Sequence, residues 1–259
     1  MLKPVLRIVG LCLTCATGTL GAQQAADHVA LGMAADRAHD LKSAVQHFQA
    51  ALDQDSLNYQ ANWRGALTLL TLGGQIQAAK SPERDSLYAR AEYYARRAVA
   101  RDPAGADGHF ALAASVGRVS LTLGQEARIR RAAIIRNEAL RTLELNPRHD
   151  GAYHILGRWN AEIMRISGIG RFVAKNFLGA GVFNQASWAK AIYNMEKAVQ
   201  LDPGRIYHHL ELAEIYTDRK RWADAATQLE LVESLPEREV MDSVYKREAA
   251  ALQRRLVKR

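Results

Sequence analysis

Among the eight histidines of this chain, two pairs lie close together in the sequence and could together bind a metal ion or transfer a proton. His208 and His209 are adjacent, and His149 and His154 lie five residues apart. Histidines that share a metal ion from one helix face stand at positions i and i+4, and neither pair has this spacing. We therefore expect no metal site. A histidine near a helix start is ordinarily a surface or capping residue, and we expect this role for the adjacent pair.

No catalytic motif stands out in the sequence. It contains no GxSxG nucleophile elbow, no HExxH metalloprotease motif and no Walker phosphate loop. Gly168 and Gly170 are spaced as in a phosphate-binding loop, but Val173 occupies the place of a third glycine. Such a segment is more typical of a turn between helices. The sequence therefore predicts a protein that is not an enzyme and that needs no cofactor.

The first 22 residues have the layout of a secretory signal peptide. Lys3 and Arg7 precede an apolar run at 8–22, and the small residues Gly21 and Ala22 suit cleavage nearby. The run is shorter than the roughly 20 apolar residues that span a membrane. We expect this segment to be removed and the protein to be exported to the periplasm or secreted. A retained N-terminal anchor is the alternative.

The positions of the cysteines and the low aromatic content argue against three further classes of site: disulfides, thiolate metal sites and nucleic-acid sites. Cys12 and Cys15 both lie in the signal-like segment, so the exported chain would have neither a disulfide nor a thiolate metal site. The full chain has a formal net charge of +8, but aromatic residues, which stack on nucleic-acid bases, make up only 7%. We expect the basic clusters to be solvated helix faces and predict no nucleic-acid ligand. The largest cluster comprises Arg128, Arg130, Arg131, Arg136 and Arg141.

A repeated helix ending marks the elements that must position any site. The strings ALDQDS, AVARDP, TLELNP and AVQLDP close at residues 56, 103, 147 and 203, and each has Asp or Asn directly before its last residue. Proline lacks an amide hydrogen and disfavours helical geometry in the residue before it. Hydrophobic residues at 48% supply a packed core. The recurrence predicts an all-α array of helical hairpins.

The first and last hairpins resemble the tetratricopeptide repeat (TPR), a helix-turn-helix unit of about 34 residues with small residues at fixed positions. Gly32, Ala44, Ala213 and Ala225 occupy small positions of the repeat. The resemblance implies a right-handed α-solenoid of about five hairpins with a C-terminal capping helix. The predicted organisation is a signal peptide at 1–22, a repeat domain at 23–236 with units at about 25–58, 60–103, 104–147, 150–203 and 206–239, and a capping helix at 237–259.

The three middle units are longer than the repeat, so insertions must lengthen them. The first insertion, at 73–84, is predicted to be a polar loop that ends at Ser81, a helix cap followed by proline. The second is expected to lengthen the helices about Gly124. The third, at 165–187, is expected to form a short helix packed between units, and contact with a partner or a membrane surface is the alternative. Its apolar residues are Ile166, Ile169, Phe172, Val173, Phe177 and Leu178.

The chain from about residue 150 to residue 236 also resembles the regulator of microtubule dynamics family of TPR proteins. The resemblance rests on HILGRWNAEI at 154–163, on the following GRFVAKNFLG, and on ASWAKAIYNMEKAVQLDP, which ends at residue 203. It implies a helical repeat protein with a binding role, and association with microtubules in the animal members. The residues that match a family segment are Gly157, Arg158 and Trp159, together with residues 177–179.

The TPR resemblance also implies where a ligand would bind, because the first helix of each hairpin lines the concave groove of the solenoid. We expect Arg158 to pair with a ligand carboxylate and Tyr207 to stack on the ligand or donate its hydroxyl. The predicted function is a non-enzymatic protein- or peptide-binding scaffold of the periplasm or cell envelope, without a specified partner or oligomeric state. A microtubule- or membrane-associated adaptor is the alternative. The predicted groove residues are His154, Arg158, Glu162, Tyr207, Glu214 and Asp218.

Overall fold

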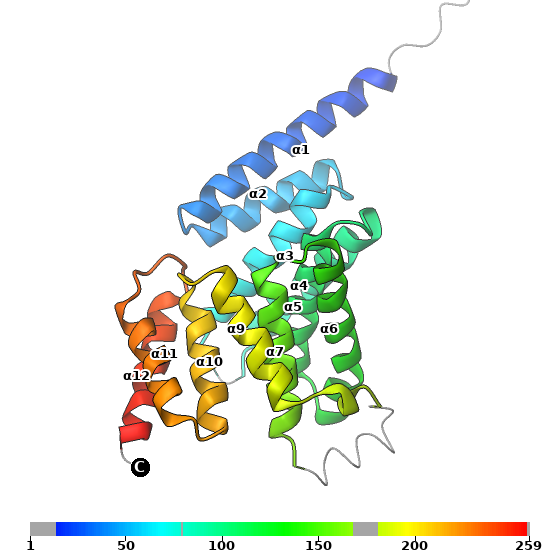
Figure 1. Ribbon diagram of the computed structural model, residues 1–259. Helices are drawn as coiled ribbons and strands as arrows, with labels where there is room; N and C mark the ends of the chain where they lie inside the picture. Colours follow the sequence, from blue (N-terminus) through cyan, green and yellow to red (C-terminus); the bar gives the residue numbers. More distant parts are fainter. Residues whose placement is uncertain (1–13, 79, 168–180, 258–259) are drawn as a thin grey trace, which may run out of the picture.

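The computed structural model describes residues 14–78, 80–167 and 181–257, and within these ranges it contains helices and no strand (Figure 1). Consecutive helices pair as five hairpins. The pairs are α1 (Thr14–Arg37) with α2 (Leu41–Gln54), α3 (Tyr59–Gly74) with α4 (Pro82–Arg101), α5 (Ala106–Thr122) with α6 (Gln125–Leu145), α7 (Asp150–Arg165) with α9 (Trp188–Leu201), and α10 (Ile206–Asp218) with α11 (Trp222–Ser234). A short 3-10 helix, η1 (Gly181–Gln185), precedes α9, and α12 (Asp242–Val257) follows the last hairpin. The predicted all-α fold is confirmed.

The repeated helix ending acts through the side chain of its Asp or Asn. In each of the four strings, the side-chain oxygen of this residue accepts a hydrogen bond from the backbone N–H two residues later, at 3.0–3.2 Å. This Asx turn satisfies a donor beyond the helix end and reverses the chain. It forms equally where Ser56 replaces proline, so the Asx residue defines the turn. The four residues are Asp55, Asp102, Asn146 and Asp202.

Small residues lie where the two helices of a hairpin approach closely. A Cβ atom placed on Gly32 would lie 2.7 Å from the ring of Phe48, so a larger residue would push α1 away from α2. Ala44, Ala213 and Ala225 have no exposed surface. Because protein interiors are close-packed, a bulky side chain at these positions forces the helices apart.

The first two insertions are taken up largely by longer helices. The helices α4 and α6 have 20 and 21 residues. As predicted, Ser81 caps α4: its hydroxyl accepts a backbone hydrogen bond at 3.1 Å, and Pro82 is the first helical residue. The loop is shorter than the predicted 73–84, because α3 continues to Gly74.

The residues at the C-terminal end of the third insertion pack against α6 and α7. Residues 168–180, which include most of the apolar positions of the predicted amphipathic element, lie outside the described residues. On the C-terminal side of this gap, Phe183 in η1 is buried against Trp159 and Ile163 of α7 and against α6. Ser187 then caps α9 by accepting a backbone hydrogen bond. These contacts hold the start of α9 beside α7.

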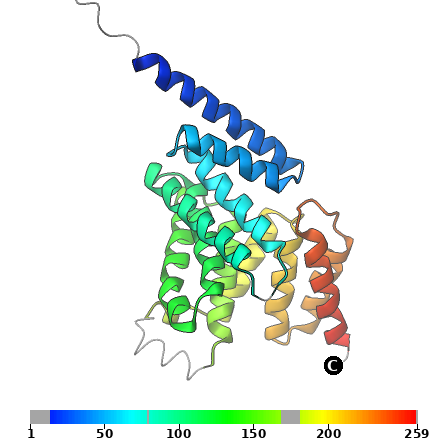
Figure 2. The ribbon, with the colours of Figure 1, turned by 180° about the vertical axis from the view of Figure 1, so that it is seen from behind.

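The hairpins follow a curved path, with α6 and α12 on opposite sides of the molecule (Figures 1 and 2). The path bends back toward its start: a Cβ atom on Gly74, at the end of α3, would lie 3.8 Å from the side chain of Met241, just before α12. The helix α12 packs on α10 and α11 through Ala249 and Leu252. The C-terminal helix therefore covers the last hairpin and also faces the inside of the curve.

The predicted cleavage position lies within α1. Gly21 and Ala22 belong to this helix, which extends beyond α2 and away from the other hairpins (Figures 1 and 2). Residues 1–13 lie outside the described range. In the parts of the chain that the structure describes, no helix combines the length and the hydrophobicity of a membrane-spanning segment.

Candidate functional site

The six predicted groove residues lie on two first helices of neighbouring hairpins. Three of them follow one another on α7 at intervals of four residues, and three lie on α10 at intervals of seven and four. These intervals place each set on one face of its helix. The α7 set is His154, Arg158 and Glu162, and the α10 set is Tyr207, Glu214 and Asp218.

A cavity of about 580 Å³ lies between α5, α6, α7 and α10, and we call it the inter-hairpin cavity. Its lining includes four of the predicted residues, namely His154, Arg158, Glu162 and Tyr207. Glu214 and Asp218 instead line a neighbouring hollow of about 330 Å³ beside α12. The structure therefore brings four of the six residues to one cavity and the other two to a second depression.

Arg158 already has a carboxylate partner within the protein. Its Nη1 atom lies 2.9 Å from Oε1 of Glu211, which is buried on α10, and it also donates to the hydroxyl oxygen of Tyr207. The Glu211 carboxylate is the main cause that raises the pKa of Arg158. A ligand carboxylate would have to compete with Glu211 for this guanidinium. The sequence indicated the arginine but gave no sign that α10 supplies its counter-ion.

Tyr207 contacts two rings within the protein, one stacked and one tilted. Its ring centroid lies 4.3 Å from that of Tyr245 on α12, with the two planes 11° apart, and 4.4 Å from the ring of His154. Burial raises the pKa of the Tyr207 hydroxyl, and it raises the pKa of Tyr245 to about 12. Both phenols are therefore neutral hydrogen-bonding groups at neutral pH. The contact of α12 with Tyr207 was not predicted from the sequence.

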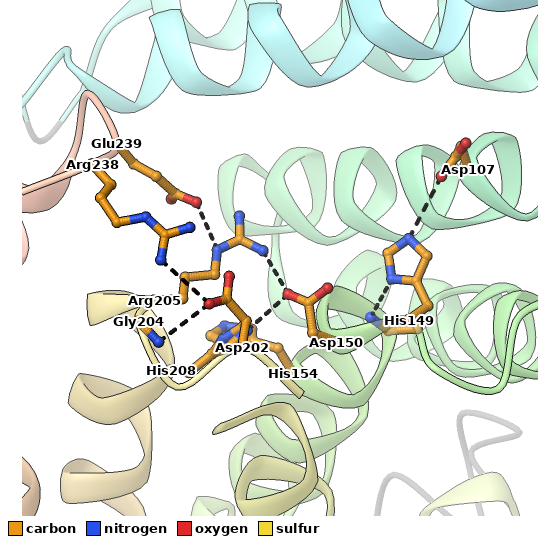
Figure 3. A network of polar contacts seen from close by, with 11 residues as sticks. Asp107, His149, Asp150, His154, Asp202, Gly204, Arg205, His208, Arg238 and Glu239 are labelled. Atoms are coloured by element: carbon orange, nitrogen blue, oxygen red, sulfur yellow. Dashed lines mark hydrogen bonds and ion pairs between the residues drawn. The ribbon is translucent and has the colours of Figure 1, made fainter. Parts of the chain in front are cut away.

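A polar network joins the third, fourth and fifth hairpins beside the cavity (Figure 3). Oδ2 of Asp150 lies 2.9 Å from Nη1 of Arg205 and 2.9 Å from Nε2 of His208. Arg205 also pairs with Glu239 at 2.9 Å, ahead of α12. Burial acts to raise the pKa of Asp150, but the hydrogen bond from His208 and the charge of Arg205 outweigh it and lower this pKa.

The same network contains a direct contact between two histidines. Nδ1 of His154 lies 2.9 Å from Nδ1 of His208, so one ring donates and the other accepts. Burial is the main cause that lowers the pKa of both histidines. Both rings are therefore neutral at pH 7. The exposed fractions are 6% for His154 and 1% for His208.

The prediction that His208 and His209 are surface or capping residues was wrong. His209 is also buried, and its ring lies 2.9 Å from the carbonyl oxygen of Pro203 and 2.7 Å from Gln228. A signal for this role was present, because His109 contacts the carbonyl oxygen of Pro103 in the same way, six residues after the proline. Among the described residues, no group of three or more side chains could hold a metal ion.

The three consecutive residues 157–159 contact three different elements. A Cβ atom on Gly157 would lie 2.9 Å from the side chain of Met195, so the glycine lets α7 and α9 pack closely. Arg158 faces the cavity, and the indole nitrogen of Trp159 donates to the carbonyl oxygen of Ala132 in α6 at 2.8 Å. Successive helical residues are about 100° apart around the helix. Gly157 therefore packs against α9, Arg158 lines the cavity, and Trp159 contacts α6.

The basic cluster of α6 is only partly a solvated face. Arg128 and Arg130 are exposed, as predicted. Arg131 instead pairs with Glu92 of α4, and Arg136 lies over the ring of Trp159 with 5.8 Å to its centroid. Part of the cluster therefore joins α6 to its neighbours.

Solved structures with a similar fold include TTC0263, a thermophilic TPR protein of Thermus thermophilus. It has a TM-score of 0.63 and 19% identity, and the match covers 88% of this chain and 99% of that chain. The PilF protein of Pseudomonas aeruginosa has a TM-score of 0.54 and 14% identity, with 89% of each chain covered. At these identities the likeness concerns the fold. None of the curated proteins matches the sequence.

One family matches along almost the whole chain. The sequence model of the family described as regulator of microtubule dynamics protein 1-3 matches residues 23–257. The match includes the Gly-Arg-Trp segment on α7, both sets of groove residues and α12. The chain therefore belongs to the regulator of microtubule dynamics protein 1-3 family and folds as a TPR protein.

Proposed function

We propose that this protein is a non-enzymatic scaffold that binds a protein segment or peptide in the groove formed by α5, α7 and α10. The observation that supports this most directly is the inter-hairpin cavity, which combines apolar walls with polar side chains from three successive hairpins. Ligand sites are commonly concave, largely apolar and equipped with a few convergent polar groups. In a solenoid of hairpins, the inner wall is the surface that offers such a site.

Two arginines that line the cavity are held in place by carboxylates of the protein. Arg158 pairs with Glu211, and Arg205 pairs with Asp150. The hydroxyl of Ser120 donates to the carbonyl oxygen of its own helix four residues earlier, so it is not positioned beside a general base. We infer that these side chains fix the shape and polarity of the groove and do not carry out a covalent step.

We further propose that the protein acts after export, in the periplasm or cell envelope. The signal-like layout of residues 1–22 supports this location, and the family match begins directly after it, at Gln23. The alternative is an adaptor associated with microtubules or membranes, and the description of the family supports the microtubule association. N-terminal sequencing of the purified protein separates the two: a start near Gln23 supports export, and an intact Met1 contradicts it.

A photo-cross-linking experiment tests the groove as the binding surface. We place benzoylphenylalanine at Glu162, an exposed residue that lines the cavity, and separately at Tyr193, which is 55% exposed on α9 and outside the cavity lining. Because both positions are exposed, both variants should fold. We expect discrete cross-linked protein adducts from the first position and none from the second, identified by mass spectrometry. Adducts from Tyr193 alone, or from neither position, would refute the proposed groove.

A further inference from the structure

The cavity extends from the groove into the space between α5 and α7. Apolar side chains of both helices, of α6 and of η1 form its walls there. A volume of about 580 Å³ lies within the range of roughly 300–1,000 Å³ that is typical of ligand pockets. The apolar lining includes Phe110, Leu121, Ile129, Ile155, Trp159 and Phe183.

One residue of this wall, Gly117, leaves space for a ligand although glycine destabilises the helix that contains it. Gly117 lies inside α5 and lines the cavity, and a Cβ atom placed on it would have no neighbour within 4 Å. By contrast, a Cβ atom on Gly151 would lie 2.6 Å from the ring of Phe110. Glycine in a helix interior is destabilising relative to alanine. Close packing therefore explains Gly151 but not Gly117, where the open volume belongs to the cavity.

Next to this opening lies an arginine that forms no ion pair within the described part of the chain. Arg118 lines the cavity, and its electrostatic neighbours include Tyr207, Arg158, Tyr245 and the carboxylate of Glu248. Arg158 has Glu211, whereas no ion pair or hydrogen bond joins Arg118 to another described residue. A guanidinium in this position can donate two parallel hydrogen bonds to a carboxylate.

A third group, in a residue that lines the cavity, lacks a hydrogen-bond donor. The Nε2 atom of His208 faces the Asp150 carboxylate, so it carries the proton in the neutral ring. Its Nδ1 atom then accepts from Nδ1 of His154, which leaves Nε2 of His154 as an acceptor. This nitrogen is buried without a partner among the described residues, and His154, 6% exposed, lines the cavity.

We propose that the inter-hairpin cavity is the subsite for a peptide segment with a large apolar side chain next to an acidic residue. The apolar side chain enters beside Gly117, the carboxylate binds Arg118, and a peptide N–H donates to Nε2 of His154. The last contact favours a peptide over an acyl-chain anion, which has no N–H to offer. This inference rests on the proposed peptide-binding function and specifies its ligand.

A peptide selection tests the subsite. A phage-displayed library of random heptapeptides is selected on the purified protein, and the enriched peptides are titrated by fluorescence polarisation. We expect sequences in which a large apolar residue neighbours Asp or Glu. Gly117→Phe, which fills the opening, should weaken binding about tenfold or more, whereas the matched Gly117→Ala should retain it within about threefold. Arg118→Gln should weaken the acidic peptides about tenfold and leave their Asn or Gln analogues unchanged.

Circular dichroism of each variant verifies folding before titration. Enriched peptides that lack an acidic residue, or that bind Gly117→Phe as well as wild type, would overturn the subsite while peptide binding itself stands. Failure to enrich any sequence would also overturn it, and the cross-linking experiment then decides separately whether the groove contacts proteins. If dodecanoate binds wild type but not Gly117→Phe and no peptide does, the occupant is an acyl chain and the peptide assignment is wrong.

Discussion

The contact between His154 and His208 predicts that the protein loses stability as the pH falls below neutral. Burial lowers the pKa of both rings, and for His154 the charges of Arg158 and Arg205 lower it further. The hydrogen bond to Asp150 acts in the opposite direction on His208 but does not outweigh burial. The folded protein therefore holds both rings neutral at a pH where the unfolded chain protonates them.

The sign and size of the effect follow from this difference. The unfolded pKa is 6.5, so the stability that these histidines contribute is complete above about pH 7 and is lost as the pH falls through 6.5. His154, whose pKa lies well below 6.5 in the folded protein, should cost up to about 2 kcal/mol between pH 7 and pH 5, and His208 adds to this loss. This is a substantial part of the about 5–15 kcal/mol that stabilises a typical protein. Asp150, whose pKa is lowered, adds a further loss below about pH 4.

Urea unfolding at pH 7, 6 and 5 measures this loss. His154→Asn places an amide nitrogen near the position of Nδ1, where it can still donate to His208, but removes one titrating group, so the loss between pH 7 and pH 5 should be up to about 2 kcal/mol smaller than in wild type. The matched control is His39→Asn, at an exposed position with φ of 62°, a backbone conformation that asparagine adopts readily. It should leave the loss unchanged. An equal loss in wild type and His154→Asn would refute this explanation.

Three substitutions test the packing and capping of the hairpins. Ala225→Trp, at a position with no exposed surface, should unfold the last hairpin, and an unchanged melting temperature would show that no tight helix crossing exists there. Ser81→Ala should cost about 1 kcal/mol in urea unfolding, because α4 loses its N-cap. Gly117→Ala should raise stability by about 0.5–1 kcal/mol, since the added methyl group meets no atom; a loss of stability would mean that the site is closed.

The sequence was informative about the fold because its strongest signal is local. Asp or Asn before each breaking residue forms an Asx turn with a backbone N–H two residues away, so the repeated strings mark helix ends without reference to tertiary structure. Ser81 was predictable for the same reason, because the backbone N–H that it caps lies only three residues later, in α4. Gly32 was also indicated, because its partner Phe48 lies in the same hairpin.

The candidate site was less predictable because its contacts join residues from different hairpins. Repeat positions placed Arg158 and Tyr207 on inner helices, but their internal partners, Glu211 and Tyr245, depend on how hairpins are oriented. His208 was misassigned for the same reason: its partners lie at the start of α7 and on its inner face. The periodicity of one helix cannot show that a polar residue is buried against a polar residue of another.

The orientation of the last two hairpins is fixed by the network that borders the cavity. Asp150 begins α7 and contacts Arg205 and His208 at the start of α10, while Arg205 also pairs with Glu239, which precedes α12 (Figure 3). These contacts set the angle between α7 and α10, which are the first helices of the last two hairpins, and hold α12 beside the groove. The position of Tyr245 against Tyr207 therefore depends on the ion pairs that Arg205, itself a cavity-lining residue, makes with Asp150 and Glu239.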